Sequence, residues 1–260
     1  MLDERLIRAL HVEALRRDQI HAEREPHVLF QASTIGALIE GAYEGDVSFA
    51  ELAEHGDLGL GTLNHLDGEM IALDGRFYRA DTEGAINEVD PDERTPFAVL
   101  TWFHPTIEVE LAGPLDNEEL LGRLDEALPD GTNACAVRIH GSFELIRARS
   151  VPRQSPPYRP LTEVVADQHV FELTGVEGTV VGFRFPDYSE GVEVSGYHLH
   201  FIAQDRSRGG HVLECRPGAG RALIDPSTDL HLELPPGVEL DSPGLSTSTR
   251  EAIDRVEHSG

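Results

Sequence analysis

Along much of the chain, apolar and polar residues alternate or apolar residues form short runs, which is typical of β-strands. The pattern predicts strands at 30–33, 70–73, 77–78, 96–103, 134–139, 143–151, 170–173, 179–185, 197–203, 211–215 and 230–234. The turn-forming segments Asp74-Gly75 and His140-Gly141-Ser142 predict two hairpins. Helical periodicity is confined to 3–24, 34–41, 48–54, 116–128 and a terminal helix that begins after Ser248.

These elements predict an α/β fold of an α+β-like kind, with two β-rich lobes of mixed or antiparallel sheets and a few flanking helices. The stretch from Pro152 to Pro160 is rich in proline, which stiffens a connection without joining a sheet. We place a boundary there. The predicted domains are a charged N-terminal helix or arm over 1–26, an N-terminal α/β lobe over 27–160, and a C-terminal β-rich lobe with a terminal helix over 161–260.

The charge of the chain limits its partners. The formal net charge is −26 over 260 residues, and there is no lysine. Nucleic acids and anionic membrane surfaces need a basic face, so neither is expected to bind. The N-terminus is acidic from Asp3 and lacks the apolar core of a signal peptide, and no apolar run is long enough to cross a bilayer. These features predict a cytoplasmic protein.

A group of histidines in the last third of the chain suggests a metal site. His198 and His200 alternate on one predicted strand, so their side chains project from the same face roughly 6 to 7 Å apart. The polar turn 205–210 then returns the chain, and a hairpin would bring His211 close to opposite His200. Three imidazoles with an open fourth position suit catalytic zinc, and the two cysteines, Cys135 and Cys215, cannot make a closed structural site. The alternative is a pair of strand histidines that face solvent.

Three charged residues on or next to the predicted strands are candidates for a site. Glu69 stands between Gly68 and an apolar run, where a strand inside a sheet would more often carry an apolar residue. An ordinary edge carboxylate is the other interpretation. Arg147 and Arg149 share one face of an alternating strand.

Several segments, in this order, carry a resemblance to a known family. They are Ser33-Thr34-Ile35, Tyr43-Glu44-Gly45-Asp46, Gly56-Asp57-Leu58-Gly59-Leu60-Gly61-Thr62, Leu66-Asp67-Gly68-Glu69-Met70, Thr95-Pro96-Phe97-Ala98-Val99, Ala148-Arg149-Ser150-Val151-Pro152, Leu161-Thr162-Glu163-Val164 and the histidine segment. From about Val28 to Glu257 the chain resembles the alpha-acetolactate decarboxylase family.

The resemblance implies a cytosolic, zinc-dependent enzyme that converts 2-acetolactate to acetoin and carbon dioxide, with its active site between two β-rich lobes. It implies a small-molecule substrate as partner, neither nucleic acid nor membrane, and leaves a homodimer open. By resemblance, the zinc (Zn²⁺) ligands are His198, His200 and His211. The polar groups around the metal and in its pocket are Glu69, Arg149, Glu257 and Thr62.

The implied reaction explains these residue types. Loss of carbon dioxide leaves an electron pair that must delocalise into the adjacent ketone as an enediolate, which a metal acting as a Lewis acid would stabilise. The guanidinium of Arg149 can hold the substrate carboxylate or steady the enediolate. A carboxylic acid must then deliver a proton to one face, which sets the chirality of acetoin. We assign this role to Glu69, with Glu257 as the alternative donor or as a group that orients a metal-bound water.

Two other classes of protein are compatible with a histidine cluster. A cupin-like metal oxygenase or isomerase also has a His-x-His strand, but a glutamate follows the second histidine by four or five residues. Gln204 and Asp205 occupy those places, which argues against this class. A non-catalytic metal-binding module would need the histidines but not Glu69 and Arg149 beside them.

The acidity of the chain predicts a response to salt. Uncompensated carboxylates repel one another, and added salt screens them within a Debye length of about 10 Å at 0.1 M. We expect the thermal unfolding midpoint to rise from low salt to molar NaCl. A flat or falling midpoint would mean that the acidity reflects composition rather than adaptation to salt.

Overall fold

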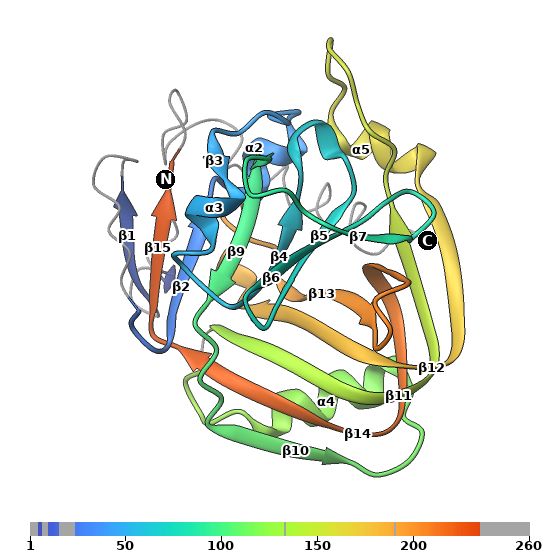
Figure 1. Cartoon of the computed structure of the whole chain (residues 1–260). Helices are drawn as coiled ribbons and strands as arrows, with labels where there is room; N and C mark the ends of the chain where they lie inside the picture. The colour runs from blue at the N-terminus through green and yellow to red at the C-terminus, as the bar shows by residue number, and fades with distance from the viewer. Residues whose placement is uncertain (1–4, 7–9, 16–23, 133, 190, 235–260) are drawn as a thin grey trace.

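The computed structural model describes residues 5–6, 10–15, 24–132, 134–189 and 191–234. Two β-sheets form most of this part of the chain, and a few short helices flank them (Figure 1). The predicted fold class, with mixed and antiparallel sheets and few helices, is confirmed.

The first sheet is mixed. Its strands, in spatial order, are β1 (His11–Leu15), β15 (Asp229–Glu233), β2 (Val28–Ala32), β9 (Phe97–Thr101), β4 (Leu58–Thr62), β5 (Glu69–Leu73), β6 (Arg76–Ala80) and β7 (Ile86–Glu88). β15 pairs in parallel with both β1 and β2, and the other pairs are antiparallel. Every residue of β4, β5 and β9 is buried, so the middle of this sheet is covered on both faces.

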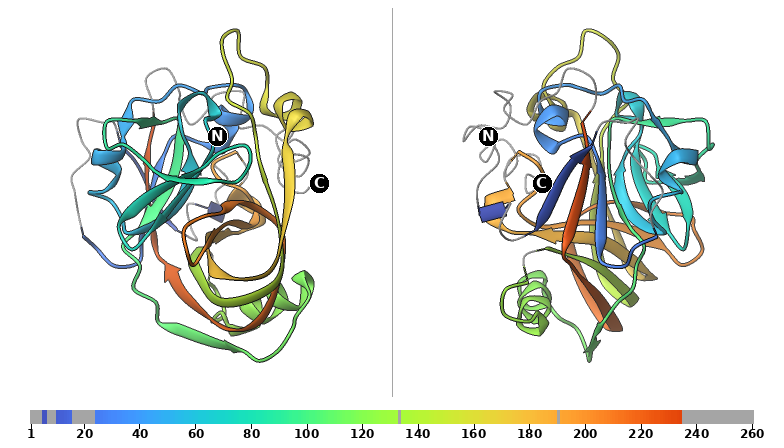
Figure 2. Two further views of the ribbon diagram at one scale, coloured as in Figure 1. Left: turned by 45° about the vertical axis from the view of Figure 1, so that its right-hand side comes forward. Right: turned by 90° about the vertical axis from the view of Figure 1, so that its left-hand side faces the viewer.

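The second sheet is antiparallel and strongly curved. Its strands, in order, are β10 (Ile107–Leu111), β14 (Gly209–Ser227), β11 (Ala134–Ser150), β12 (His169–Phe185) and β13 (Gly196–Ala203). β13 also pairs with the start of β14, so four strands close on themselves (Figure 2). This closing pair joins β13, at one end of the sheet, to β14, which lies next to the strand at the other end.

The remaining elements are short. They are the two-stranded sheet of β3 (Val47–Ser48) and β8 (Arg94–Thr95), the helices α2 (Ile35–Ile39), α3 (Phe49–Leu52), α4 (Asn117–Ala127) and α5 (Leu161–Val164), and the 3-10 turns η2 (Asn64–Leu66), η3 (Val165–Asp167) and η4 (Asp187–Ser189). α4 lies outside the second sheet (Figure 2), where Leu120 and Leu124 pack against it. A capping box at Asp116 and Glu119 satisfies backbone donors at its start.

The main hydrophobic core lies between the two sheets. Alternate residues of a strand point to one face, and on the inner face of β4 and β5 these include Leu58, Leu60, Ile71 and Leu73. Ile202 of β13 belongs to the same core. The other face of the first sheet packs on α3 through a separate cluster.

On three strands, the row of alternate residues that faces the core between the sheets ends in polar side chains. The row of β4 ends at Thr62, the row of β5 begins at Glu69, and on β13 the residues on the same face as Ile202 are His200 and His198. The apolar core between the sheets therefore gives way, at one end, to a group of polar residues.

One predicted hairpin is wrong. Residues 134–150 form the single strand β11 without a reversal at His140-Gly141-Ser142. Gly141 lies opposite Gly220 on one neighbouring strand and Gly178 on the other, and a Cβ at Gly141 would press against the backbone of β14. Glycine therefore serves close approach and bending of long strands here, and not a turn.

The sheets do not divide at residue 160. β10 and β11 precede this position but belong to the second sheet, whereas β15 follows it and belongs to the first. The three-part division into domains stays a prediction, but it does not separate the sheets.

The termini were predicted to be helical. Within the predicted N-terminal helix, His11–Leu15 is instead a strand, because pairing with β15 overrides the local helical pattern. The predicted terminal helix after Ser248 lies outside the described residues.

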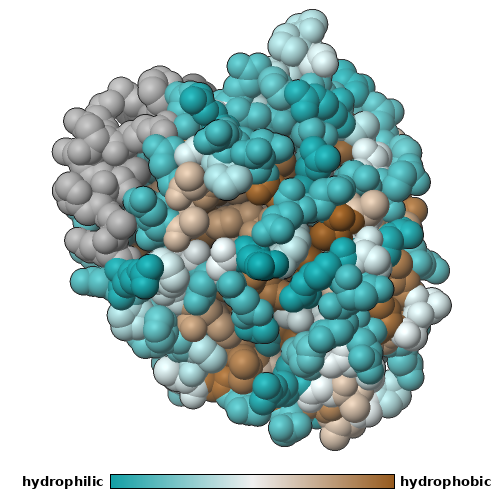
Figure 3. Space-filling model, viewed as in Figure 1, coloured by the Kyte–Doolittle hydropathy of each residue, from teal (hydrophilic) through white to brown (hydrophobic). Residues whose placement is uncertain are grey.

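The surface fits the composition. The face drawn in Figure 3 is largely hydrophilic, with smaller apolar areas between polar side chains. Among the described residues, no helix has both the length and the apolar character needed to cross a bilayer.

The packing of β12 against β13 generates a test of the fold around the histidines. Gly182 pairs with Leu199, and a Cβ at Gly182 would collide with the carbonyl oxygen of His198. We expect Gly182→Ala to lower the free energy of unfolding by about 1 to 3 kcal/mol, as overpacking does. Gly122 is the control, since a Cβ there meets no atom within 4 Å and Ala is favoured in a helix by about 1 kcal/mol. Urea unfolding of both variants measures the two changes in the free energy of unfolding. Equal losses in the two variants would contradict the close packing inferred at Gly182.

Candidate metal centre

The hairpin of β13 and β14 positions the three histidines. His198 and His200 alternate on β13, and His200 is the direct cross-strand partner of His211 on β14. The reversal between the strands is tight, since the backbone N–H of Ala203 donates to the carbonyl of Arg208. The predicted hairpin and the place of His211 opposite His200 are confirmed.

The three imidazoles converge in a buried place. Their ring centroids lie 5.1 to 5.3 Å apart, and one nitrogen from each ring lies within 4.8 Å of the others. All three side chains are buried, so they do not have the solvent exposure of ordinary strand histidines. This arrangement could hold a metal ion.

His200 is prepared to act as a neutral ligand. Its Nδ1 donates to the backbone carbonyl of Met70 at 2.7 Å, which leaves the lone pair on Nε2. Burial lowers the pKa of His200 well below its usual value, and the neighbouring His198 and Arg149 lower it further, against the effect of the Met70 carbonyl. Nε2 of His200 is buried and has no hydrogen-bond partner among the described residues. A buried nitrogen in this state suits a bond to a cation.

Glu69 and Arg149 stand beside the histidines. Arg149 on β11 is the cross-strand partner of His211, so Arg149, His211 and His200 form one row across three strands. Nη1 of Arg149 lies 3.3 Å from Oε1 of Glu69, and Oε2 of Glu69 lies 3.7 Å from Nε2 of His200. Both charged side chains are buried, which rules out the edge-carboxylate interpretation of Glu69.

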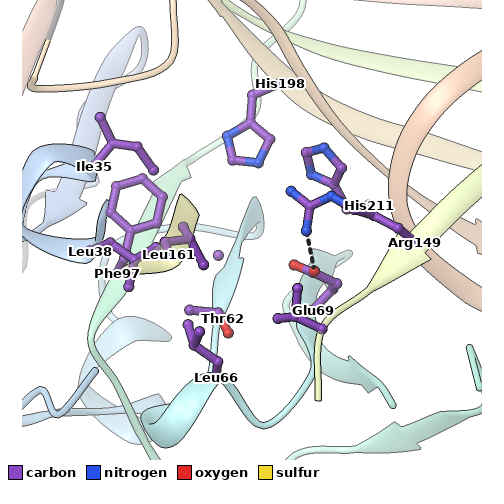
Figure 4. A pocket seen from close by; sticks show the side chains of 12 residues that line it. Ile35, Leu38, Thr62, Leu66, Glu69, Phe97, Arg149, Leu161, His198 and His211 are labelled. Carbon is purple, nitrogen blue, oxygen red and sulfur yellow. Dashed lines mark hydrogen bonds and ion pairs between the residues drawn. The ribbon is translucent and has the colours of Figure 1, made fainter. Parts of the chain in front are cut away.

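A small pocket opens onto this group. Thr62, opposite Glu69 across β4 and β5, lies at its floor, and its hydroxyl donates to the carbonyl of Gly68 at 2.8 Å. Apolar side chains make one wall and polar ones the other (Figure 4). The apolar lining residues are Ile35, Leu38, Leu66, Phe97, Val151 and Leu161, and the polar ones are Thr62, Glu69, Arg149, His198 and His211.

The structure brings together six of the seven residues predicted for the site. The seventh, Glu257, lies outside the described residues. Sequence reasoning did not single out the carbonyl of Met70 or the carboxylate of Glu193, which contacts His198. An acidic residue between two valines, five positions before His198, is the signal that could have drawn attention to Glu193.

The chain is similar to several known proteins along most of its length. The alpha-acetolactate decarboxylase of Methylococcus capsulatus is 44% identical over 259 residues, which cover 99% of each chain. That of Klebsiella aerogenes is 40% identical over 234 residues, 90% of each chain. The crystal structure of alpha-acetolactate decarboxylase from Bacillus subtilis matches with a TM-score of 0.84 at 35% identity, and the match covers 89% of this chain and 100% of that one. The sequence model of alpha-acetolactate decarboxylases matches residues 29–246, and the chain belongs to this family.

Proposed function

We propose that this chain is a zinc-dependent enzyme that decarboxylates 2-acetolactate to acetoin and carbon dioxide, with His198, His200 and His211 as the zinc ligands. The observation that carries the proposal is the convergence of three buried imidazoles beside a buried Arg149 and Glu69. Membership of the alpha-acetolactate decarboxylase family supports the reaction. A cytoplasmic location stays a prediction from the sequence, and a homodimer stays open.

The donor set fits zinc. Three neutral nitrogen donors with an open position for substrate are typical of catalytic zinc. The lone pair of His200 Nε2 faces the centre of the group, and the nearest carboxylate oxygen of Glu69 is 3.7 Å away. When bound, the metal would supply a Lewis acid that draws electron density from the hydroxyl and ketone oxygens of the substrate.

Arg149 is placed to bind negative charge. Its guanidinium is permanently charged, and the strand pairing with His211 and the contact with Glu69 fix its orientation. In a site from which water is largely excluded, such a fixed charge stabilises the substrate carboxylate and the enediolate that remains after carbon dioxide leaves. We assign this binding and stabilising role to Arg149.

Glu69 is the proton donor in this proposal. It is the carboxyl group that lines the pocket among the described residues, and it lies between Arg149 and His200. From this place it can reach only one face of an enediolate held by Arg149, so that acetoin would form as one enantiomer. Glu257 remains the alternative donor.

The apolar wall completes the site. Ile35, Leu38, Phe97 and Leu161 stand opposite the polar group (Figure 4). They offer a surface for the methyl groups of acetolactate and exclude water, which strengthens the electrostatic interactions of Arg149 and Glu69. Thr62 also lines the pocket, and its hydroxyl, which donates to the carbonyl of Gly68, can accept a hydrogen bond from the hydroxyl group of the substrate.

The structure gives no support to the two alternative classes. Gln204 and Asp205, the positions of a cupin-like carboxylate ligand, are exposed at the hairpin turn and do not face the histidines. A module that only binds metal would not require the buried ion pair of Glu69 and Arg149 in its pocket.

Metal binding and turnover should be lost together when a ligand is removed. We expect His200→Ala to abolish stoichiometric zinc binding and to reduce acetoin formation to background, because two imidazoles are a poor site for catalytic zinc. Elemental analysis and an acetoin assay are the measurements. His169→Ala, which changes a half-exposed histidine on β12, is the control and should keep both properties. A His200→Ala variant that is metal-free and fully active would rule out the metal assignment.

Substitutions of Glu69 and of Arg149 should differ in their effect on the chirality of acetoin. We expect Glu69→Gln to lower kcat by about 100-fold or more, the usual range for general acid catalysis, and to erode the enantiomeric purity of acetoin. Arg149→Lys keeps the positive charge but loses the planar guanidinium and its paired hydrogen-bond donors, so it should slow the reaction and leave the chirality of acetoin unchanged. Chiral chromatography of the product is the measurement.

Two surface variants on β11 serve as controls for this pair. Glu144→Gln and Arg138→Lys make the same chemical changes outside the pocket and should match the wild type. Full rate and a single enantiomer from Glu69→Gln would show that another group donates the proton, with Glu257 next in line.

A further inference from the structure

A second carboxylate lies next to the histidines, outside the lining of the pocket. Glu193 belongs to the segment between η4 and β13, and its side chain is completely buried. Val192 and Val194 on either side of it are buried in the core between the sheets. Glu193 does not line the substrate pocket. A carboxylate at this depth costs free energy unless it is paired or hydrogen-bonded.

The carboxylate of Glu193 contacts one of the three histidines. Its Oε1 lies 3.3 Å from Nδ1 of His198. An ionised carboxylate can only accept a hydrogen bond, so this contact holds the ring proton of His198 on Nδ1 and leaves the lone pair on Nε2. The carbonyl of Met70 does the same for His200. The partner of His198 differs from that of His200 because a carboxylate, unlike a backbone carbonyl, carries a full negative charge when it is ionised.

The backbone around Glu193 is fixed from both sides. The carbonyl of Ser189 accepts hydrogen bonds from the N–H groups of Val192 and Glu193. The carbonyl of Val192 in turn accepts from Nε2 of the buried Gln31 at 2.7 Å and from the N–H of Ile35 at the start of α2. The backbone of the segment that carries Glu193 is therefore anchored to β2 and α2.

We propose that Glu193 is a positioning residue for the metal centre, which orients His198 and supplies a compensating negative charge. The proposal rests on the function given above. A divalent ion with three neutral imidazoles, next to the cation of Arg149, would leave a buried excess of positive charge. Glu69 must carry a proton to act as the donor, so it does not offset this charge. Glu193 lies outside the pocket lining and can offset it when ionised, without reacting with the substrate. A carboxylate bound to a ligand histidine also makes that histidine a stronger donor.

The test compares metal affinity in Glu193→Gln and the wild type. The amide keeps the size of the side chain and can still accept from Nδ1, but it removes the charge. We expect Glu193→Gln to bind Co²⁺ and Zn²⁺ about 10- to 100-fold more weakly in competition with a chelator, as loss of such partners typically does. The visible spectrum of the Co²⁺ form should shift as well. Affinity within twofold of the wild type in the folded variant would overturn the proposal.

The control is Ser189→Ala, which disturbs the same segment but keeps the carboxylate. Its hydroxyl donates to the carbonyl of Pro186 at 2.7 Å. A purely structural role for Glu193 predicts that both variants lose affinity in parallel with thermal stability. Our proposal predicts a loss of affinity in Glu193→Gln alone.

A measurement on the wild type keeps the proposal testable if Glu193→Gln does not fold. In protein labelled with ¹⁵N at histidine, long-range proton–nitrogen correlations report the tautomer of each ring. The resonances that are lost in His198→Gln should show a proton on Nδ1 in the metal-free form. A proton on Nε2 would overturn the proposal. Acetoin formation by the wild type tests the proposed function separately, so failure of one can be told from failure of the other.

Discussion

The pairing of β13 with β14 is the constraint on which the site depends. It sets His200 opposite His211, and the pairing of β14 with β11 sets Arg149 in the same row. Because side chains alternate along a strand, a slip of one residue in either pair would turn these groups toward the apolar interior of the second sheet. The closure of that curved sheet is therefore what assembles the site, although most of its residues lie far from the substrate.

Contacts with neighbouring groups explain how Arg149, Glu69 and His200 can be buried in the protein interior. Arg149 and Glu69 contact each other, and His200 is tied to the carbonyl of Met70 on the first sheet. Burial without such partners would be strongly unfavourable. These contacts also hold the dipoles and charges in place before the substrate arrives, so little reorganisation is needed when negative charge develops during the reaction. The two sheets thus contribute different parts of one preorganised environment.

The local parts of this arrangement could be predicted from the sequence, and the non-local parts could not. The alternation of His198 and His200 before a turn determines their common face, and a carboxylate at Glu69 is conspicuous before an apolar run. The sequence around Gly141 is typical of a turn, but Gly141 is extended because it packs closely against the neighbouring strands. No local pattern shows that Asp229–Glu233 pairs with the first sheet, or that Glu193 becomes buried against a histidine.

The most direct test of the central claim is a titration of the metal-free wild-type protein with zinc, with acetoin formation from racemic 2-acetolactate measured at each step. If the three histidines form the one catalytic metal site, the rate of acetoin formation should rise in proportion to added zinc and reach its plateau at one ion per chain. Full activity before any metal is added, or no acetoin after one equivalent has bound, would contradict the account.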